Sequence, residues 1–313
     1  MAARILIAYD GSPSAASAVR AAAVLFPGAE ALVANVPEPI STRTETVARA
    51  AAMIPPELVQ RTLDDLHAEA RERADAAARE GIERARGAGL EAEAASAADN
   101  APAWSALLAL AREREAAVLV CGTRGRGAFA RAVLGSTSSS LLHNADLPLL
   151  VVPDGGGRLE GPAVLAYDGS DEADHAIQAA ARLLTGRPAV VLHAWESQFR
   201  HGLTARALAR GPVDDLREIV ASLDQALEDD ATATTEQGLE LARFAGLDAS
   251  GEALESDIGI WPTLAAAARA RGAAVIVTGT RGLGAARSAL LGSVSSGLVR
   301  NAELPVLVVP APG

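Results

Sequence analysis

Aromatic side chains are scarce in this chain: they make up 3% of its 313 residues, although half of the residues are hydrophobic. The core is therefore expected to be built from Ala, Val and Leu, with helices and strands packed closely through small side chains. There is a single cysteine, Cys121, which excludes an intramolecular disulfide and fits a reducing cytoplasm. Because Cys121 follows an apolar run, we interpret it as a small core residue rather than a reactive thiol.

An excess of positive charge and long apolar runs are also missing. The chain has 28 Lys and Arg residues against 39 Asp and Glu, a formal net charge of -11. That balance argues against a general binder of nucleic acid or of anionic membranes. No apolar run reaches the roughly 18 residues of a membrane span. The apolar stretch among the first ten residues is too short to be the hydrophobic region of a signal peptide. We therefore expect a cytoplasmic protein with neither a membrane nor a nucleic-acid partner.

What the chain does contain is a long internal repeat. The string Gly-Thr-Arg-Gly occurs at 122–125 and again at 279–282, and in each copy nine residues separate it from a Gly-Ser pair. Tyr9-Asp10-Gly11-Ser12 likewise returns 158 residues later as Tyr167-Asp168-Gly169-Ser170. A chain of this length suggests about two domains. We predict domains at 1–153 and 162–313, joined by a glycine-rich linker between two prolines.

Within each half, apolar strands alternate with Ala-rich or charged helices. This alternation predicts the α/β fold class, with a parallel sheet covered by helices on both faces. Such sheets bind ligands at the carboxyl ends of their strands. The predicted strands are 5–8, 31–36, one after Gly89, one before Gly122 and 147–152, with counterparts at 164–166, 189–195, after Gly246, before Gly279 and 304–309. The predicted helices are 14–25, 56–88, one near Trp104 and one after Ser136, with counterparts at 171–184, 213–245, near Trp261 and after Ser293.

The repeated glycine string has the chemistry of a phosphate site. Glycine brings main-chain N–H groups close to an anion without side-chain bulk. The candidate glycines are Gly122, Gly125 and Gly127 in the first half and Gly279, Gly282 and Gly284 in the second. Ser136 and Ser293 fall where a helix begins, and each can cap that helix and favour phosphate there. The alternative interpretation is a set of helix caps and tight turns with no ligand.

Charged residues near the glycine strings differ between the copies. Arg124 and Arg126 lie in the first loop, whereas the second keeps Arg281 but has Leu283 in place of Arg126. We therefore expect the first loop to hold phosphate better than the second. Asp10 and Asp168 follow the first strand of each half, near the same sheet edge. Each carboxylate has two interpretations, a nucleotide ligand or the acceptor of a tight turn.

Taken together, these motifs resemble the ATP-binding branch of the universal stress protein family. The resemblance implies two tandem Rossmann-like (adenine nucleotide alpha hydrolase-like) domains, each a five-stranded parallel sheet of order 3-2-1-4-5. It also implies that ATP, with Mg²⁺ as a candidate companion, lies over strands one and four. The candidate binding residues are Asp10, Val36, Gly122, Arg124, Gly125, Arg126, Gly127, Gly135, Ser136 and Thr137. Their counterparts are Asp168, Ala194, Gly279, Arg281, Gly282, Gly284, Gly292, Ser293 and Val294.

The resemblance also bears on assembly and on departures from the family. In that family the last strand pairs two domains, so here the strands at 147–152 and 304–309 are expected to pair within one chain as a pseudo-dimer. A homodimer of whole chains is a further option. Ala194 replaces the valine that is usual at the end of the second strand in the family. This substitution is expected to weaken the contact with adenine in the second half.

Three functions stay open on the sequence. The first is a regulatory, stress-response module that binds ATP and signals to an unknown protein partner. The second is a weak ATP hydrolase, although no Ser-His-Asp or Cys-His set and no metal-ligand spacing is visible, so we predict no catalytic residue and no metal ligand. The third is a nucleotide-free interaction scaffold. Segments 37–56 and 196–212 are placed to fold over a ligand as lids.

Overall fold

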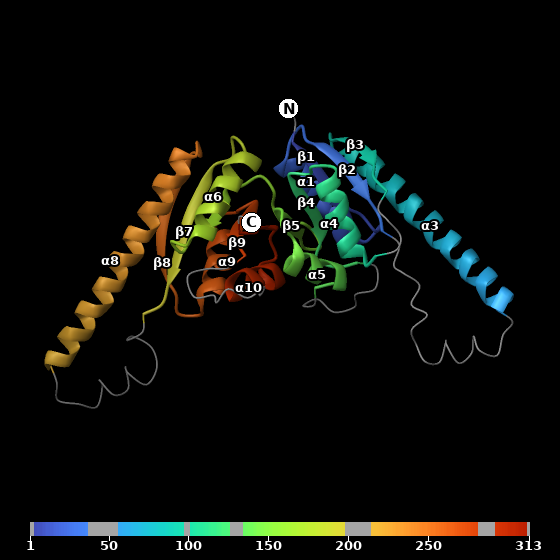
Figure 1. Cartoon of the computed structure of the whole chain (residues 1–313). Coiled ribbons are helices and arrows are strands. Elements are labelled where there is room, and N and C mark those ends of the chain that lie inside the picture. The colour runs from blue at the N-terminus through green and yellow to red at the C-terminus, as the bar shows by residue number, and fades with distance from the viewer. Residues whose placement is uncertain are drawn as a thin grey trace.

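The computed structural model describes residues 3–36, 56–96, 101–125, 134–197, 214–280 and 292–311. They form two α/β halves that lie side by side, with the long helices α3 and α8 at the outer ends (Figure 1). The first half consists of β1 (Arg4–Ala8), α1 (Pro13–Leu25), β2 (Glu30–Ala34), α3 (Pro56–Gly87), β3 (Glu91–Ala94), α4 (Ala103–Glu113), β4 (Val118–Gly122), α5 (Ser136–Asn144) and β5 (Leu149–Val152).

The second half repeats this order. It consists of β6 (Ala163–Ala166), α6 (Asp171–Leu183), β7 (Ala189–Trp195), α8 (Asp214–Phe244), β8 (Ala249–Glu255), α9 (Ile260–Ala270), β9 (Val275–Gly279), α10 (Ser293–Asn301) and β10 (Val306–Val309). The predicted order of strands and helices is confirmed. The predicted lids at 37–56 and 196–212 fall almost entirely outside the described residues. No helix in the described part of the chain has both the length and the apolarity needed to cross a membrane.

All the strands of the two halves join one sheet, in the order β3-β2-β1-β4-β5-β10-β9-β6-β7-β8. Each half therefore has the expected order 3-2-1-4-5, with parallel pairs inside it. The halves meet where β5 and β10 pair antiparallel, with Leu150 opposite Leu307. This is the predicted pairing of the two last strands within one chain.

Helices cover both faces of this sheet. Successive strand residues point to opposite faces, so Ile5 and Ile7 belong to the core that contains residues of α1 and α6, whereas Leu6 belongs to the core that contains residues of α4, α5, α9 and α10. The helical contributions are largely alanine, such as Ala18 and Ala22 of α1, both fully buried. The expected small-residue core is thus confirmed, and it keeps helices and sheet close together.

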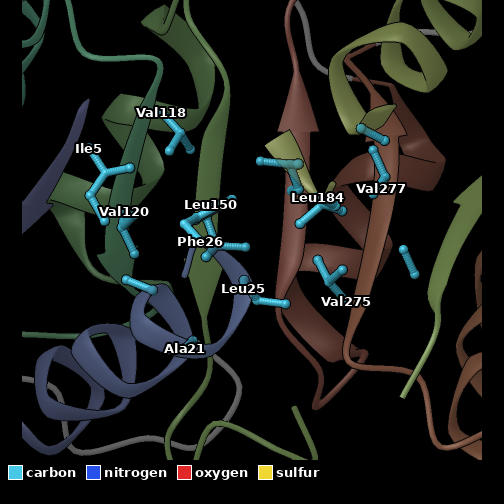
Figure 2. Close-up of a cluster of buried hydrophobic side chains, with 14 of the residues drawn as sticks. Ile5, Ala21, Leu25, Phe26, Val118, Val120, Leu150, Leu184, Val275 and Val277 are labelled. Carbon is cyan, nitrogen blue, oxygen red and sulfur yellow. The ribbon is translucent and has the colours of Figure 1, made fainter. Parts of the chain in front are cut away.

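The two halves share one of these cores. Figure 2 shows Phe26 beside Leu150 in the first half, with Leu184 of the second half across the junction. Arg187 reinforces the junction: its Nη1 donates to the carbonyls of Leu159 and Gly161 at 3.0 and 2.7 Å, and its Nη2 to that of Val24 at 3.1 Å. Burial lowers the pKa of the Arg187 guanidinium. The orientation of the halves is therefore fixed by apolar packing and by hydrogen bonds across the linker.

Serine caps start the first helix of each half. Ser12 accepts a hydrogen bond from the Ala15 N–H at 3.1 Å, and Ser170 accepts one from the Ala173 N–H at 3.2 Å. These caps satisfy main-chain donors that the helix itself leaves unpaired. Helix α1 begins at Pro13, one residue before the predicted start, because the fixed φ of proline suits the first helical position. The capped ends bring Asp10 and Asp168 to the carboxyl edge of the sheet.

Candidate functional site

A cavity of about 710 Å³ opens in the first half at the carboxyl ends of β1, β2 and β4. This is the point where strand order reverses between β1 and β4, the usual ligand position in such sheets. Its walls include the predicted residues Asp10, Val36, Gly122, Arg124, Gly125, Gly135, Ser136 and Thr137. The structure therefore brings together, in one cavity, predicted residues that are more than 120 positions apart in the sequence. The predicted Arg126 and Gly127 lie outside the described residues.

The two ends of the glycine loop are tied to each other and to the sheet. The Thr123 N–H donates to the Val152 carbonyl at 2.9 Å, and the Gly135 N–H donates to the Thr123 carbonyl at 2.8 Å. The Ser138 hydroxyl donates to the Gly122 carbonyl at 2.7 Å, which fixes the first turn of α5 against the end of β4. The N-terminus of α5, where main-chain N–H groups favour an anion, is thereby held at the cavity wall.

The cap of α5 differs from the serine cap considered for it. Gly135 is the N-cap residue, which has no side chain to cap the helix, and Ser136 is the first residue of the helix. The second half repeats this arrangement, with Gly292 as the cap and Ser293 as the first residue of α10. Ser136 is therefore not the N-cap residue, and it lines the cavity beside Thr137.

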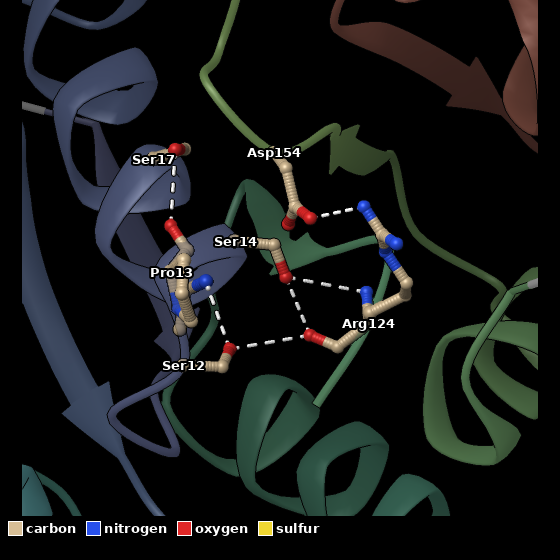
Figure 3. Close-up of polar contacts among 7 residues, drawn as sticks. Ser12, Pro13, Ser14, Ser17, Arg124 and Asp154 are labelled. Carbon is tan, nitrogen blue, oxygen red and sulfur yellow. Dashed lines mark hydrogen bonds and ion pairs between the residues drawn. The ribbon is translucent and has the colours of Figure 1, made fainter. Parts of the chain in front are cut away.

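Gly122 is required because the start of α1 lies against the end of β4. A Cβ atom at Gly122 would lie 2.7 Å from the main-chain carbon of Ser14. Such a distance is too short for carbon atoms, so any side chain would push α1 away from the loop. The close approach allows Ser14 and Ser12 to bond the loop directly: both hydroxyls donate to the Arg124 carbonyl, at 2.5 and 3.2 Å, and the Arg124 N–H donates to the Ser14 hydroxyl at 3.2 Å (Figure 3).

The Arg124 side chain leaves the loop toward the linker between the halves. Its guanidinium pairs with the Asp154 carboxylate, just after β5 (Figure 3). Because Arg124 also lines the cavity, this ion pair joins the candidate site to the interdomain linker. The sequence pattern identified Arg124 but not its partner, since nothing in the repeat indicates Asp154.

Asp10 takes part in a turn and also lines the cavity. Its Oδ1 accepts the Ser12 N–H at 2.9 Å, and Asp168 accepts the Ser170 N–H at 3.1 Å in the same way. The turn interpretation is therefore confirmed. The other oxygen of Asp10 faces the loop, since a Cβ atom at Gly125 would lie 2.8 Å from Oδ2. One carboxylate is thus placed to brace the turn and to line the candidate site.

Several residues of the site had not been predicted from the sequence. The Asn35 amide donates to the Tyr9 carbonyl at 2.7 Å, and His193 Nδ1 donates to the Tyr167 carbonyl at 2.9 Å, so each fixes the end of a first strand. On α3, Leu66, Ala70 and Arg73 line the cavity, and Arg73 pairs with Glu69 one turn earlier. A helical spacing of three or four residues toward the site is the signal that could have found the α3 wall.

The long helices also pack directly on the tyrosines that precede Asp10 and Asp168. A Cβ atom at Gly81 would lie 2.8 Å from the Tyr9 ring, and one at Gly238 would lie 2.6 Å from the Tyr167 ring. Burial, followed by the hydrogen bond to Glu80, raises the pKa of Tyr9 to about 12. Burial and the hydrogen bond to Asp174 raise the pKa of Tyr167 as well. The alignment of these two glycines in the repeat is a signal that could have found the contact.

The remaining titratable group of the cavity is the thiol of Cys121. Burial raises the pKa of Cys121 to about 12, and the residue is 4% exposed. The interpretation as a core residue is therefore confirmed. Among the described residues, no group of three or more His, Cys, Asp or Glu side chains is arranged to hold a metal ion.

The second half keeps the main-chain arrangement of the loop. The Gly292 N–H donates to the Thr280 carbonyl at 2.7 Å, and the Ser295 hydroxyl donates to the Gly279 carbonyl at 2.6 Å. Of its predicted residues, Asp168, Ala194, Gly279, Gly292, Ser293 and Val294 are described, and Arg281, Gly282 and Gly284 are not. Ala194 lies within β7, opposite Leu254 of β8, whereas Val36 lies two residues beyond the end of β2.

Comparison with known proteins agrees with this geometry. A family model described as "Universal stress protein family" matches residues 1–153 and 161–310. The chain belongs to the universal stress protein family. It is 31% identical to a universal stress protein of Mycolicibacterium smegmatis over 206 residues, 63% of this chain and 62% of the relative. It is 30% identical to a universal stress protein of Mycobacterium tuberculosis over 210 residues, 64% of this chain and 60% of the relative.

A solved structure also shares the whole tandem architecture. A universal stress protein from Archaeoglobus fulgidus matches with a TM-score of 0.65 and 19% identity, over 100% of both chains. At this identity the likeness concerns the fold alone. The alignable regions span about three fifths of the length of the mycobacterial relatives. This universal stress protein chain is thus a tandem of two family domains with the α/β fold predicted for it.

Proposed function

We propose that this tandem universal stress protein binds ATP in the cavity of its first half, and more weakly at the matching position of its second half. The observation that carries the proposal is the cavity of about 710 Å³ over β1 and β4. Its size lies in the range of about 300–1,000 Å³ that is usual for small-molecule sites. Its walls combine apolar surface for a base with a glycine loop, a helix N-terminus and two arginines for phosphates.

Each wall of the cavity is suited to one part of the nucleotide. Ala34 and Leu107 offer apolar surface for adenine, with the main chain at Val36 as its hydrogen-bonding edge. Asp10 is an acceptor for the adenine amino group or a ribose hydroxyl. The main chain of Gly122, Gly125 and Gly135 and the hydroxyls of Ser136 and Thr137 are donors for phosphate oxygens. We propose the same roles in the second half for Asp168, Ala194, Gly279, Arg281, Gly282, Gly284, Gly292, Ser293 and Val294.

Arg126 and Gly127 complete the proposed loop of the first half. The donor set fits the phosphates of a nucleotide, and a Mg²⁺ ion would enter with the ATP rather than on a carboxylate cluster of the described residues. In the cell we propose a cytoplasmic regulator of the stress response, whose bound state is read by a protein partner. We propose domain limits of 1–153 and 162–313.

The test is a calorimetric titration of MgATP into the nucleotide-stripped chain and into two matched variants. Ser136→Glu puts a negative charge where phosphate is proposed, and Ser293→Glu does the same in the second half. Glutamate is favourable in the first turn of a helix, by roughly 0.3–1 kcal/mol, so neither change is expected to disturb folding. We expect two binding events, with the tighter one lost in Ser136→Glu and the weaker one lost in Ser293→Glu.

Two results would contradict the proposal. Absence of binding heat in the unmodified chain, together with an unchanged melting temperature at millimolar MgATP, would leave a nucleotide-free scaffold. Retention of the tighter event in Ser136→Glu would place the nucleotide elsewhere. Phosphate release measured in the same samples, above a buffer control, would add hydrolysis to the proposed binding.

A further inference from the structure

Arg124 lies between the candidate nucleotide cavity and the linker that joins the two halves. Its main chain is held by the hydroxyls of Ser12 and Ser14 at the start of α1. Because the main chain of Arg124 is fixed, its guanidinium can pair only with anions within reach of the side chain from this position. It is 17% exposed and pairs with the 42% exposed Asp154 (Figure 3). The guanidinium is therefore partly withdrawn from water, where an ion pair is worth more than at an open surface.

Asp154 belongs to a turn that contacts both halves. The turn is closed by the Gly156 N–H, which donates to the Pro153 carbonyl at 3.0 Å. Arg20 of α1 donates to the Gly155 carbonyl at 3.3 Å. A Cβ atom at Gly157 would lie 3.3 Å from Leu304, just before β10 of the second half. A change at Asp154 is therefore felt by α1 on one side and by the entry to β10 on the other.

A carboxylate and a phosphate bind a guanidinium in the same way, through parallel N–H···O bonds, so they compete for it. In the first half, Asp154 follows Pro153, the proline directly after β5; in the second half, the residue after the matching Pro310 is Ala311. The acid is therefore specific to the half in which the cavity is described.

We propose that Asp154 is an internal competitor for the Arg124 guanidinium, so that a nucleotide phosphate in the first site displaces Asp154 and loosens the linker between the halves. This inference rests on the proposed function, because it assigns a regulatory role at the same site. Linkage then works in both directions: a nucleotide weakens the Arg124–Asp154 pair, and loss of that pair strengthens nucleotide binding by the same factor.

The first experiment compares ATP with adenosine as probes in the full-length chain. Asp154→Asn is expected to tighten ATP binding by about 3- to 5-fold, from the loss of one ion pair, and to leave adenosine binding unchanged. Asp154→Glu keeps the charge and is expected to resemble the unmodified chain. Glu160→Gln removes the same charge from the same linker without removing the ion pair, and is the matched control. Melting temperatures verify that all variants are folded.

The second experiment measures the linker itself. Trypsin cleaves after arginine, and Arg158 is exposed four residues after Asp154. Mass spectrometry of limited digests gives the rate of cleavage after Arg158. We expect ATP to raise that rate in the unmodified chain, and Asp154→Asn to show the raised rate without ATP.

The outcomes separate the two proposals. If ATP binds equally well to Asp154→Asn and to the unmodified chain, or if cleavage after Arg158 ignores ATP, the competitor role is wrong and the nucleotide site stands. If neither chain binds ATP, both proposals are wrong. If Asp154→Asn and Glu160→Gln tighten ATP binding equally, the effect comes from the change in net charge of the linker, and the specific role of Asp154 is overturned.

Discussion

The two halves of the molecule share their main-chain hydrogen bonds but differ in the side chains around the candidate sites. Both loops are closed by a Gly N–H to Thr carbonyl bond and braced by a serine three residues further on. Around them, the second residue of the first helix is Ser14 in one half and Glu172 in the other. On the long helices, Arg73 of the cavity wall corresponds to Asp230.

This difference teaches that the two copies keep the same main-chain frame around the site, meaning its glycines and hydrogen bonds, but not the same charged side chains. The frame is kept because Gly122 and Gly279 lie where the end of a strand meets the main chain at the start of a helix, and a side chain there would push that helix away. The charged positions face solvent or the cavity, where substitutions cost little stability. The second half keeps Arg281 at the position of Arg124, but it has Asp230 in place of Arg73 and Glu172 in place of Ser14, so the residues around its loop are more acidic than those of the first half.

The largest expected effect concerns the glycines that end β4 and β9. Gly122→Ala places a methyl group 2.7 Å from the Ser14 main chain, whereas Gly279→Ala meets Glu172 at 3.0–3.1 Å. Forcing extra volume into packed structure costs about 1–3 kcal/mol, so we expect a loss near 3 kcal/mol for Gly122→Ala and near 1 kcal/mol for Gly279→Ala. Urea denaturation measures the free energy of unfolding of both variants. Equal losses would show that the two glycines are packed equally tightly against their helices.

The next effect concerns the charge on the long helices. Arg73→Glu reverses a charge at the wall of the cavity and is expected to weaken ATP binding by about 5-fold, since exposed charges contribute about 0.2–1 kcal/mol each. Asp230→Arg in the second half is expected to strengthen the weaker binding event by a similar factor. Calorimetry in low salt measures both.

The matched control for these variants is Arg79→Glu, which makes the same charge change at an exposed position of α3. It is expected to alter ATP affinity by less than about 2-fold, because an exposed charge away from the ligand is screened by salt. An effect as large as that of Arg73→Glu would mean that only the net charge of the protein matters, and the contrast between the halves would lose its local explanation.

A smaller effect, alike in both halves, is expected for the only two tyrosines of the chain. Burial raises the pKa of Tyr9 to about 12 and raises the pKa of Tyr167 as well. A raised pKa in the folded state means that the proton stabilises the fold. This stability is fully present below the ordinary tyrosine pKa of about 10 and is lost as pH rises through the folded value.

Absorbance at the wavelength of tyrosinate is the measurement for both residues. We expect no ionisation step near pH 10 in the folded chain, and a step at the ordinary value after unfolding in urea. Tyr9→Phe and Tyr167→Phe assign the remaining step to one half or the other. A normal titration of either tyrosine would show that the long helix of that half does not cover the ring.

The smallest effect concerns Cys121, whose counterpart in the second half is Thr278; both are buried. Because burial raises the pKa of Cys121 to about 12, the reactive thiolate is scarce at pH 8. We expect iodoacetamide to leave the folded chain unlabelled and to label it after denaturation, as read by intact mass. Rapid labelling of the folded chain would show that the floor of the first site is open to solvent.

Much of this structure could be predicted from the sequence because each strand and helix occurs twice, so that the pattern of one copy supports the prediction for the other. The strand order and the pairing of β5 with β10 were expected from the family resemblance, whereas the antiparallel direction of that pairing is known only from the structure. Helix limits were predicted within one or two residues where a proline or a serine cap fixes them, as at Pro13 and Pro56. The end of β2 was placed two residues too late, because Asn35 turns back to bond the Tyr9 carbonyl and ends the strand.

Only the part of the candidate site that lies in repeated local motifs was predicted from the sequence. The glycines and serines of the loop were found because a phosphate cradle needs them at fixed spacing. Arg73 and Asp154 were not found, since neither belongs to a repeated motif: the second half has Asp230 and Ala311 at the corresponding positions. The capping role considered for Ser136 was wrong because the preceding Gly135 takes the cap position, with an extended main chain that leaves Ser136 helical.

The most direct test of the contrast between the halves is to locate the nucleotide itself. The nucleotide-stripped chain is photolabelled with an azido-adenine analogue of ATP at a concentration that fills one site, and the labelled peptide is identified by mass spectrometry. We predict label on the first half, in the peptides that contain Val36 or Leu107, and its loss in Ser136→Glu and in excess ATP. Label confined to the second half, or label that excess ATP does not displace, would contradict the account.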